Sequence, residues 1–441
     1  MKILFCVEFY SPSVGGAQEV VRQLAERMSE RGNTVAIATS KIASRTKDVI
    51  KNVKIYDFEV AGNLVRGMSG EVDRYRSFLS QTEADVIFFY AAQQWTFDAA
   101  WDVLPLICAK KVLVPCGYSG LYDPAYLVYF QRMPRVLEAM DAVVYHAESY
   151  RDIDFAKFHN LGNSVIIPNG ADIKEFDVPL DPKFRQSVGA DESTRILLTV
   201  GTITGIKGHL EIAEAFAKAD FGSQKVLLLL NGNRPEQRGL KPSAIRQFVS
   251  LARGYGLYYA IRHAIKVMLL RAGYNFGKTS SIESWNLVSR QNSNGNKCAQ
   301  IVDLKRPQLI QAFLQSDLFV FASKVEYSPL VLFEACAAGL PFLTVPVGNA
   351  IEIIDWTQGG ELCSAPKDEK GYTCTQPDVL ARKIEEMLMN PDRLKVLSRN
   401  GRRASLTRFN WDNLANEYER VFQKVLSTHN FPNSSKESVA C

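Results

Sequence analysis

The sequence lacks a Cys-x-x-Cys pair, although it has eight cysteines, at positions 6, 108, 116, 298, 336, 363, 374 and 441. Structural zinc sites are typically built from such pairs, so the sequence argues against one. Scattered cysteines favour reduced thiols and a cytoplasmic protein, with a disulfide between Cys363 and Cys374 as a minor alternative.

Long hydrophobic runs are also missing. No stretch approaches the roughly 18 uncharged apolar residues that a membrane-spanning helix requires. The opening segment, Met1–Val7, is a short apolar strand without the cleavage site of a signal peptide. We therefore expect a cytoplasmic protein whose contact with a membrane, where there is one, is peripheral.

The glycine fingerprint G-x-G-x-x-G is absent, which argues against a nicotinamide dehydrogenase. Instead, Gly15 and Gly16 follow the buried-type strand Ile3–Val7 and precede a helix expected from Ala17 to Arg31. Paired glycines let the backbone approach a ligand closely, but a tight turn alone would explain them equally well. No internal repeat and no cluster of metal ligands is apparent.

What is present is a chain of 441 residues with 46% hydrophobic residues, enough for two or three domains. Apolar strands alternate with helical patterns, which predicts doubly wound parallel sheets and an α/β fold. The polar stretch Leu180–Thr194 is typical of a linker between two such domains. Helices are expected, among others, at Pro134–Met140 and Asp392–Ser398.

The most informative stretch is a predicted strand, loop and helix. The strand Leu318–Ala322 leads through a loop to a helix expected over Leu330–Ala338, with Ser328 as its N-cap and Pro329 as its first residue. Glu326 lies in the loop and Glu334 on the helix. The free N–H groups of Leu330 and Val331 lie between them, at the helix end that attracts phosphate.

A second loop offers a cation. Lys207 follows a glycine-containing loop at the end of the buried-type strand Ile196–Val200, where it is well placed to neutralise a diphosphate. The next strand, Val226–Leu230, ends at Asn231 and Gly232, which are weaker candidates for a ligand contact. Carboxylates such as Glu326 and Glu334 are good acceptors for sugar hydroxyls, so a sugar diphosphate would suit both loops.

At these residues the chain resembles the retaining family-4 glycosyltransferases, also described as glycosyl transferases group 1. Val325–Ala335 is similar to their E-x7-E signature, and Gly348 with Glu352 is similar to the segment that follows it. Pro168–Asp172 resembles their P-N-G-x-D sequence. Lys207-Gly208 matches the end of their G-R-x-x-x-x-K-G loop, in which Thr202 occupies the arginine position.

The resemblance implies the GT-B fold: two facing Rossmann-like, doubly wound α/β domains with a cleft between them. We expect an acceptor-side domain over residues 1–178 and a nucleotide-sugar domain over 195–410. A helix over 411–427 would cross back to the first domain, followed by a flexible tail over 428–441.

The resemblance also implies the reaction. A sugar would pass, with retention, from a nucleotide-diphosphate sugar to a glycan or lipid-linked acceptor in polysaccharide or cell-surface glycan biosynthesis. No cofactor or metal is expected. Glu326 and Lys207 would be catalytic. The donor would contact the glycine pair and the ends of three second-domain segments: Gly15, Gly16, Thr202, Asn231, Gly232, Leu330, Val331 and Glu334.

Two positions depart from the family pattern. Cys116 stands where many relatives have histidine, and a thiol cannot replace imidazole as a proton carrier. Tyr118, His146 or backbone groups would have to supply that contact. Thr202 removes a bidentate phosphate contact, for which Lys324 is the candidate replacement. These departures keep a second hypothesis open, a non-catalytic GT-B-like subunit that acts as a membrane or partner scaffold.

An insertion at 234–297 holds 11 Lys and Arg and two Glu, so its charge is 11 − 2 = +9 against +5 for the whole chain. Within it, residues 242–273 form a basic amphipathic pattern flanked by tyrosines, which suits an anionic membrane surface. Packing of the apolar face on the protein core is the main alternative. No nucleic-acid-binding module is visible, so nucleic acid is not an expected partner.

Overall fold

The computed structural model describes residues 1–203, 205–232 and 296–428. The chain forms two compact units, Met1–Asn169 with Trp411–Cys441 and Gly170–Asn410. The chain passes from the first unit to the second between Asn169 and Gly170. This boundary lies inside the Pro168–Asp172 motif, earlier than the predicted boundary at residue 178. At this point Ala171 forms a bridge with Asn410 and donates its N–H to the carbonyl of Phe409 at 3.1 Å.

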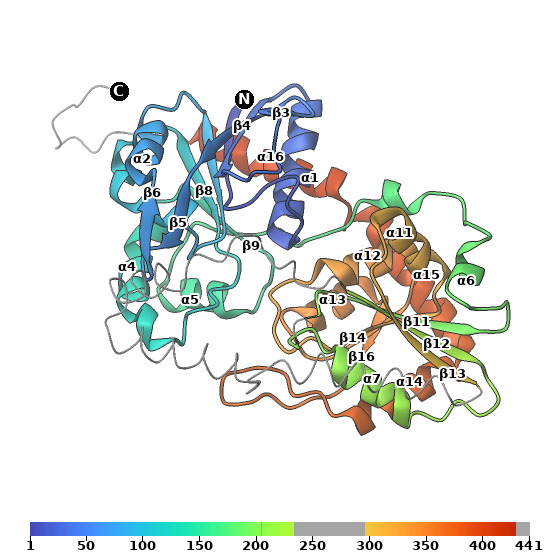
Figure 1. Cartoon of the computed structure of the whole chain (residues 1–441). Helices are drawn as coiled ribbons and strands as arrows, with labels where there is room; N and C mark the ends of the chain where they lie inside the picture. The colour runs from blue at the N-terminus through green and yellow to red at the C-terminus, as the bar shows by residue number, and fades with distance from the viewer. Residues whose placement is uncertain (204, 233–295, 429–441) are drawn as a thin grey trace, which may run out of the picture. The chain divides into compact units, whose positions relative to one another are not determined.

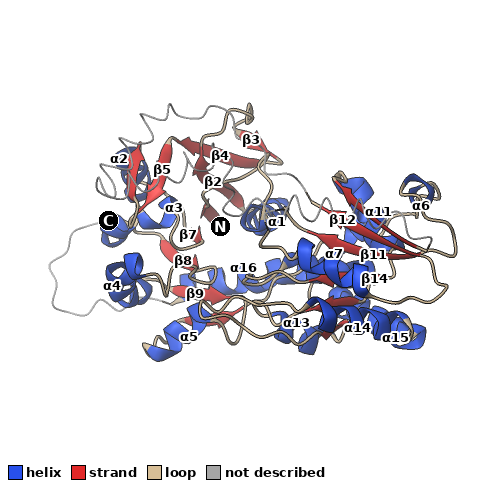
Figure 2. Ribbon diagram, turned by 60° about the horizontal axis from the view of Figure 1, so that its bottom comes forward, coloured by secondary structure: helices blue, strands red, loops and turns tan. Residues whose placement is uncertain are grey.

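The first unit is built around one sheet with helices on both faces (Figures 1 and 2). Its strands are β1 Lys2–Cys6, β2 Thr34–Ser40, β3 Val49–Ile50, β4 Val53–Phe58, β7 Val86–Tyr90, β8 Lys110–Val114, β9 Ala142–Tyr145 and β10 Ser164–Ile166, with a separate hairpin of β5 Val60–Asn63 and β6 Gly67–Gly70. Its helices are α1 Gly16–Glu30, α2 Val72–Ser80, α3 Trp95–Asp98, η1 Trp101–Leu106, η2 Pro124–Tyr126, α4 Leu127–Glu138, α5 Arg151–Phe158 and α16 Trp411–Ser427.

The sheet order is β10-β9-β8-β7-β1-β2-β4-β3, parallel except for the short edge strand β3. Strand β7 reads Val-Ile-Phe-Phe-Tyr and is buried along its whole length, and β1 is buried from Ile3 to Cys6, as expected for strands covered on both faces. On one face, the ring of Phe88 meets Tyr418 and Phe422 of α16, at centroid distances of 5.6 and 5.7 Å. Arg27 of α1 also pairs with Asp412 at 2.6 Å, so the last helix is an integral part of the first unit.

The second unit has a six-stranded sheet in the order β13-β12-β11-β14-β15-β16, and all its pairs are parallel. Its strands are β11 Arg195–Val200, β12 Val226–Asn231, β13 Lys297–Val302, β14 Leu318–Phe321, β15 Phe342–Thr344 and β16 Gly360–Leu362. Its helices are η3 Ile173–Phe176, α6 Phe184–Ser187, α7 His209–Lys218, α11 Arg306–Gln315, α12 Leu330–Ala338, α13 Ala350–Thr357, α14 Pro377–Leu388 and α15 Pro391–Thr407. The expected α/β architecture with parallel sheets in two domains is confirmed.

Three local predictions were wrong. The helix expected at Pro134–Met140 is α4, which begins at Leu127 and carries Pro134 inside it. The helix expected at Asp392–Ser398 runs on as α15 to Thr407, because α15 packs on α12, where Gly401 permits a close approach to Cys336. The stretch 180–194 is not a bare linker: it contains α6, and Phe184 and Val188 are buried in the core of the second unit.

Residues 242–273, for which contact with a membrane surface was predicted, lie outside the residues that the structure describes. Nearly all of the insertion at 234–297 also lies outside them. In the described part of the chain, no helix combines the length and the apolar character needed to cross a membrane.

Candidate functional site

The second sheet changes direction between two adjacent strands. The chain runs outward from β11 to β12 and β13, then returns to the other side of β11 and runs through β14 to β15 and β16. The loops that follow β11 and β14 therefore leave adjacent strands at the carboxyl edge of the sheet. In doubly wound folds, ligands bind at this topological switch point.

The loop after β11 is held against the loop after β14 by its backbone. Lys324 donates its N–H to the carbonyl of Ile206 at 2.8 Å. Gly208, the N-cap of α7, has φ +77°, and a Cβ there would lie 2.1 Å from the carbonyl oxygen of Ala322. Only glycine fits this close approach without displacing one of the loops.

Lys207 and Glu326 meet across these two loops. The Nζ of Lys207 lies 2.5 Å from Oε1 of Glu326, and both side chains are partly buried, at 31% and 15% exposure. An ammonium group and a carboxylate predicted to serve one ligand are thus neighbours at the switch point. Which role either plays in catalysis stays a prediction.

Helix α12 begins beside Glu326. It starts at Leu330, with Pro329 rather than Ser328 as its N-cap, and no side chain caps it. The prediction was one residue out because Pro329 adopts an extended conformation. The N–H groups of Leu330 and Val331 still have no acceptor within the helix, since a helix leaves its first four donors unsatisfied.

The turn before α13 closes on the same loop. Gly348 has φ +56°, and a Cβ there would come within 2.2 Å of the carbonyl oxygen of Tyr327. Asn349 donates its N–H to that carbonyl at 2.9 Å. The segment predicted to follow the E-x7-E signature is therefore packed against it, with the half-buried Glu352 one turn further on in α13.

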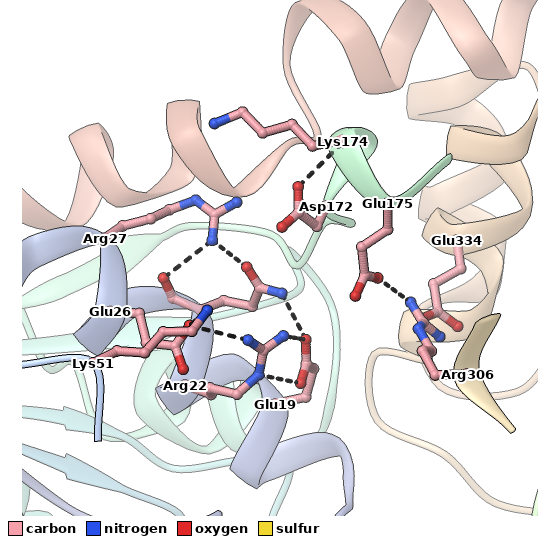
Figure 3. Close-up of polar contacts among 11 residues, drawn as sticks. Glu19, Arg22, Glu26, Arg27, Lys51, Asp172, Lys174, Glu175, Arg306 and Glu334 are labelled. Carbon is pink, nitrogen blue, oxygen red and sulfur yellow. Dashed lines mark hydrogen bonds and ion pairs between the residues drawn. The ribbon is translucent and has the colours of Figure 1, made fainter. Parts of the chain in front are cut away.

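Glu334, on α12, forms an ion pair that the sequence did not indicate. Its Oε1 lies 2.7 Å from Nη1 of Arg306, and the other arm of this guanidinium pairs with Glu175 (Figure 3). Arg306 and Glu175 come from α11 and η3, far from α12 in sequence. No spacing pattern connects them, so only the tertiary structure could reveal this contact.

The expected replacement for the missing arginine is already engaged. Thr202 is exposed and carries no charge. Lys324, the candidate substitute, lies 2.8 Å from the carboxylate of Glu211 in the first turn of α7. A phosphate would have to compete with Glu211 for this lysine.

Asn231 and Gly232 lie at the end of β12 and shape the neighbouring loops. The buried side chain of Asn231 accepts the N–H of Leu304 at 2.8 Å, and its carbonyl accepts the N–H of Gly201 at 3.0 Å. A Cβ on Gly232 would lie 2.5 Å from the carbonyl oxygen of Gly201. These contacts are structural, and a donor contact by either residue stays a prediction.

In the first unit, Gly15 and Gly16 follow β1 at the corresponding switch point, between β1 and β7. Gly15 is the N-cap of α1 in an extended conformation, and Gly16 is the first residue of the helix. Neither glycine needs a left-handed backbone. Their contact with a donor stays a prediction.

The position of Cys116 follows β8 in the first unit. Burial, with a contribution from the carboxylate of Asp152, raises the pKa of its thiol to about 12. The thiol is therefore protonated at neutral pH and cannot act as a base.

His146 and Tyr118 are core residues. The Nδ1 of His146 donates to the carbonyl of Ile167 at 2.8 Å, and its Nε2 accepts from the hydroxyl of Tyr90 at 3.1 Å. Burial lowers the pKa of His146 to about 4, so the ring is neutral at pH 7. Tyr118 is 1% exposed. These two side chains therefore do not present the contact that Cys116 lacks.

Residues 286–404 match the family model "Glycosyl transferases group 1". Over its whole length the chain is also similar to sucrose-phosphate synthase from Thermosynechococcus elongatus, with a TM-score of 0.69, 18% identity, and coverage of 97% of this chain and 100% of that one. This chain has the GT-B fold. The predicted resemblance to group 1 glycosyltransferases is confirmed, and it supports glycosyl transfer as the activity.

Two further similarities agree with this GT-B assignment. An uncharacterized glycosyltransferase of Methanocaldococcus jannaschii is 22% identical over 444 residues, which cover 96% of this chain and 98% of that protein. An Anabaena protein, HepE, whose crystal structure contains UDP, gives a TM-score of 0.66 at 14% identity, covering 96% of this chain and 100% of that one.

Within the described residues, no group of three or more His, Cys, Asp or Glu side chains could hold a metal ion.

Proposed function

We propose that this chain transfers a sugar from a nucleotide-diphosphate sugar to a glycan or lipid-linked acceptor, with retention of the anomeric configuration. The observation that carries the proposal is the Lys207–Glu326 contact at the switch point of the second sheet, beside the amino end of α12. It brings a cation, a carboxylate and free backbone donors to one edge. The UDP in HepE supports a nucleotide as the ligand of this kind of site.

In the proposed reaction, Lys207 and the N–H groups of Leu330 and Val331 offset charge on the leaving diphosphate. Glu326 holds the donor sugar and Glu334 accepts hydrogen bonds from the ribose hydroxyls. The bond from the anomeric carbon to the diphosphate breaks as the acceptor oxygen attacks the same face. The acceptor proton passes to the leaving phosphate, so this scheme requires no metal or cofactor.

Calorimetry with the Glu334→Ala variant tests the placement of the donor. Loss of a charge-assisted hydrogen bond should weaken binding of the preferred nucleoside diphosphate by about tenfold. Glu386→Ala is a matched control, because Glu386 is a 66% exposed residue of α14 that pairs with Lys383 away from the switch point. Equal affinity of Glu334→Ala and the unaltered protein would refute the placement.

The activity itself is tested with a panel of nucleotide sugars, and the anomeric configuration of the product by NMR. The exposed Thr202 and the protonated Cys116 thiol favour, as a second candidate, a non-catalytic subunit that acts as a scaffold. Turnover of a nucleotide sugar would exclude the scaffold. If the protein shows no turnover and binds no nucleotide, the result favours the scaffold over the transferase.

A further inference from the structure

Arg306 joins three elements of the second unit. It is the first residue of α11, and its guanidinium lies between Glu334 of α12 and Glu175 of η3 (Figure 3). Its Nη1 lies 2.7 Å from Oε1 of Glu334, and its Nη2 donates to Oε2 of Glu175. The two ends of the guanidinium therefore hold different carboxylates.

The surroundings restrict how this group can move. The Glu334 side chain is 16% exposed and that of Glu175 is 27% exposed, while the guanidinium carbon lies 5.7 Å from the centre of the Phe176 ring. Burial alone would lower the pKa of Arg306, but Glu334 and Glu175 outweigh it and raise the pKa above its ordinary value. Arg306 is thus a fixed cation held at both ends.

A carboxylate on a helix normally samples several rotamers, and ordering it on binding costs free energy. A planar guanidinium that is itself anchored removes much of this freedom, because it offers donors in a fixed geometry. Glu175 supplies the anchor. Its neighbour Phe176 packs on Phe313 of α11 at a ring-centroid distance of 5.8 Å, which fixes η3 against the helix that carries Arg306.

We propose that Arg306 is a positioning residue, which orients the carboxylate of Glu334 toward the ribose hydroxyls of the donor, and that Glu175 holds Arg306 in place. This inference rests on the proposed function, since that function places the ribose at Glu334. It adds two residues that neither the sequence pattern nor the family signature assigns to the site.

The test is a comparison of ribose discrimination. UDP, ADP and GDP and their 2′,3′-dideoxy counterparts are titrated into the full-length protein by calorimetry. We expect the unaltered protein to prefer the ribose form of its best nucleotide. Arg306→Met should reduce this preference by about tenfold, the loss expected for one misdirected charge-assisted hydrogen bond. Glu175→Gln should reduce it in the same direction by a smaller factor.

Arg195→Met is the matched control. Arg195 pairs with Asp317 at 2.6 Å at the amino end of β11, so the variant loses one arginine from an ion pair of the same unit but at the opposite edge of the sheet. It should keep the full preference for ribose. Should Arg306→Met fail to fold, Arg306→Lys retains the charge without the planar fork, and it should lose the same preference.

Each outcome has one meaning. Binding of none of the three nucleotides by the unaltered protein overturns the proposed function and with it this inference. Ribose preference that persists in folded Arg306→Met or Arg306→Lys overturns the positioning role and leaves the proposed function standing. An equal loss of affinity for ribose and dideoxy nucleotides in these variants also overturns the positioning role, because it indicates general damage to the unit.

Discussion

Lys207 and Glu326 come from loops that follow different strands, and they meet because β11 and β14 are neighbours in the sheet. The sequence indicated each residue separately, by the glycines around one and by the helix start beyond the other. The ion pair explains how a partly buried carboxylate is held near the amino end of α12. In the proposed reaction the lysine would also face the diphosphate, so its charge serves two anions.

Replacing Lys207 by methionine should remove the cation while keeping most of the aliphatic part of the side chain. We expect turnover of the donor to fall by about 100-fold or more, the usual cost of losing one group that stabilises charge in the transition state. Steady-state kinetics with the best donor from the nucleotide-sugar panel measures this loss.

Lys225→Met is the control for that variant. Lys225 pairs with Asp191 at 2.7 Å, is 57% exposed, and lies before β12 at the opposite edge of the sheet. Its turnover should match that of the unaltered protein. Comparable turnover in Lys207→Met and Lys225→Met would show that Lys207 has no part in the chemistry.

The loop between β11 and α7 has a structural requirement of its own. Gly208 combines a left-handed backbone with contact against the end of β14. The sequence singled out Lys207-Gly208 as a pair, but glycine is required because Ala322, the residue after β14, leaves no room for a Cβ at position 208. The position of the lysine therefore depends on the packing of two chain segments that are distant in sequence.

Substitution Gly208→Ala should cost at least about 3 kcal/mol of unfolding free energy, from backbone strain together with overlap with the carbonyl oxygen of Ala322. Nucleotide affinity should fall as the loop moves. Urea denaturation and calorimetry measure the two effects.

Gly222→Ala separates strain from overlap. Gly222 also has a positive φ, +58°, but nothing lies within 4 Å of the added Cβ. It should cost about 1 kcal/mol and leave nucleotide binding unchanged. Equal destabilisation of the two variants would mean that the contact with Ala322 is not tight.

For the whole molecule, buried titratable groups couple stability to pH. Burial lowers the pKa of His209, in the second unit, from 6.5 to about 4, as it does for His146 in the first. Asp98 in the first unit acts in the opposite sense, because burial raises its pKa from 3.8 to about 6. Between pH 3.8 and about 6, the folded state binds more protons at Asp98 than the unfolded state does. Between about pH 4 and 6.5, the folded state binds fewer protons at the two histidines.

The direction in which His209 changes the stability of the second unit with pH follows from this difference in bound protons. Below pH 6.5 the unfolded chain gains a proton that the folded unit excludes, so the second unit should lose about 3 kcal/mol as the pH falls toward 4. In His209→Gln this part of the acid sensitivity should disappear. Urea denaturation at pH 7 and near pH 4.5, with hydrogen exchange in β11 and β12, measures the difference.

His159→Gln serves as the reference, since His159 is an exposed residue. It should leave the acid sensitivity of the second unit as it is in the unaltered chain, because His159 lies in the first unit. Equal acid sensitivity of the second unit in His209→Gln and the unaltered protein would contradict the role of His209.

The sequence by itself determined the α/β class, the alternation of strands and helices, and the extent of helix α12 apart from its N-cap. These features follow from local signals, namely the apolar runs and the proline at the amino end of the helix. The sequence also singled out Glu326, Glu334 and Lys207 as candidates, because helix starts and glycine-containing loops indicate candidate anion sites without knowledge of the packing.

Only the tertiary structure decided which of these residues meet. The pairing of Lys207 with Glu326 depends on strand order, and the Glu175–Arg306–Glu334 contact depends on how η3, α11 and α12 pack. The length of α15 and the burial of His146 were likewise set by neighbouring segments. Local sequence patterns carry no record of contacts between distant segments, and such contacts bring separate charges together.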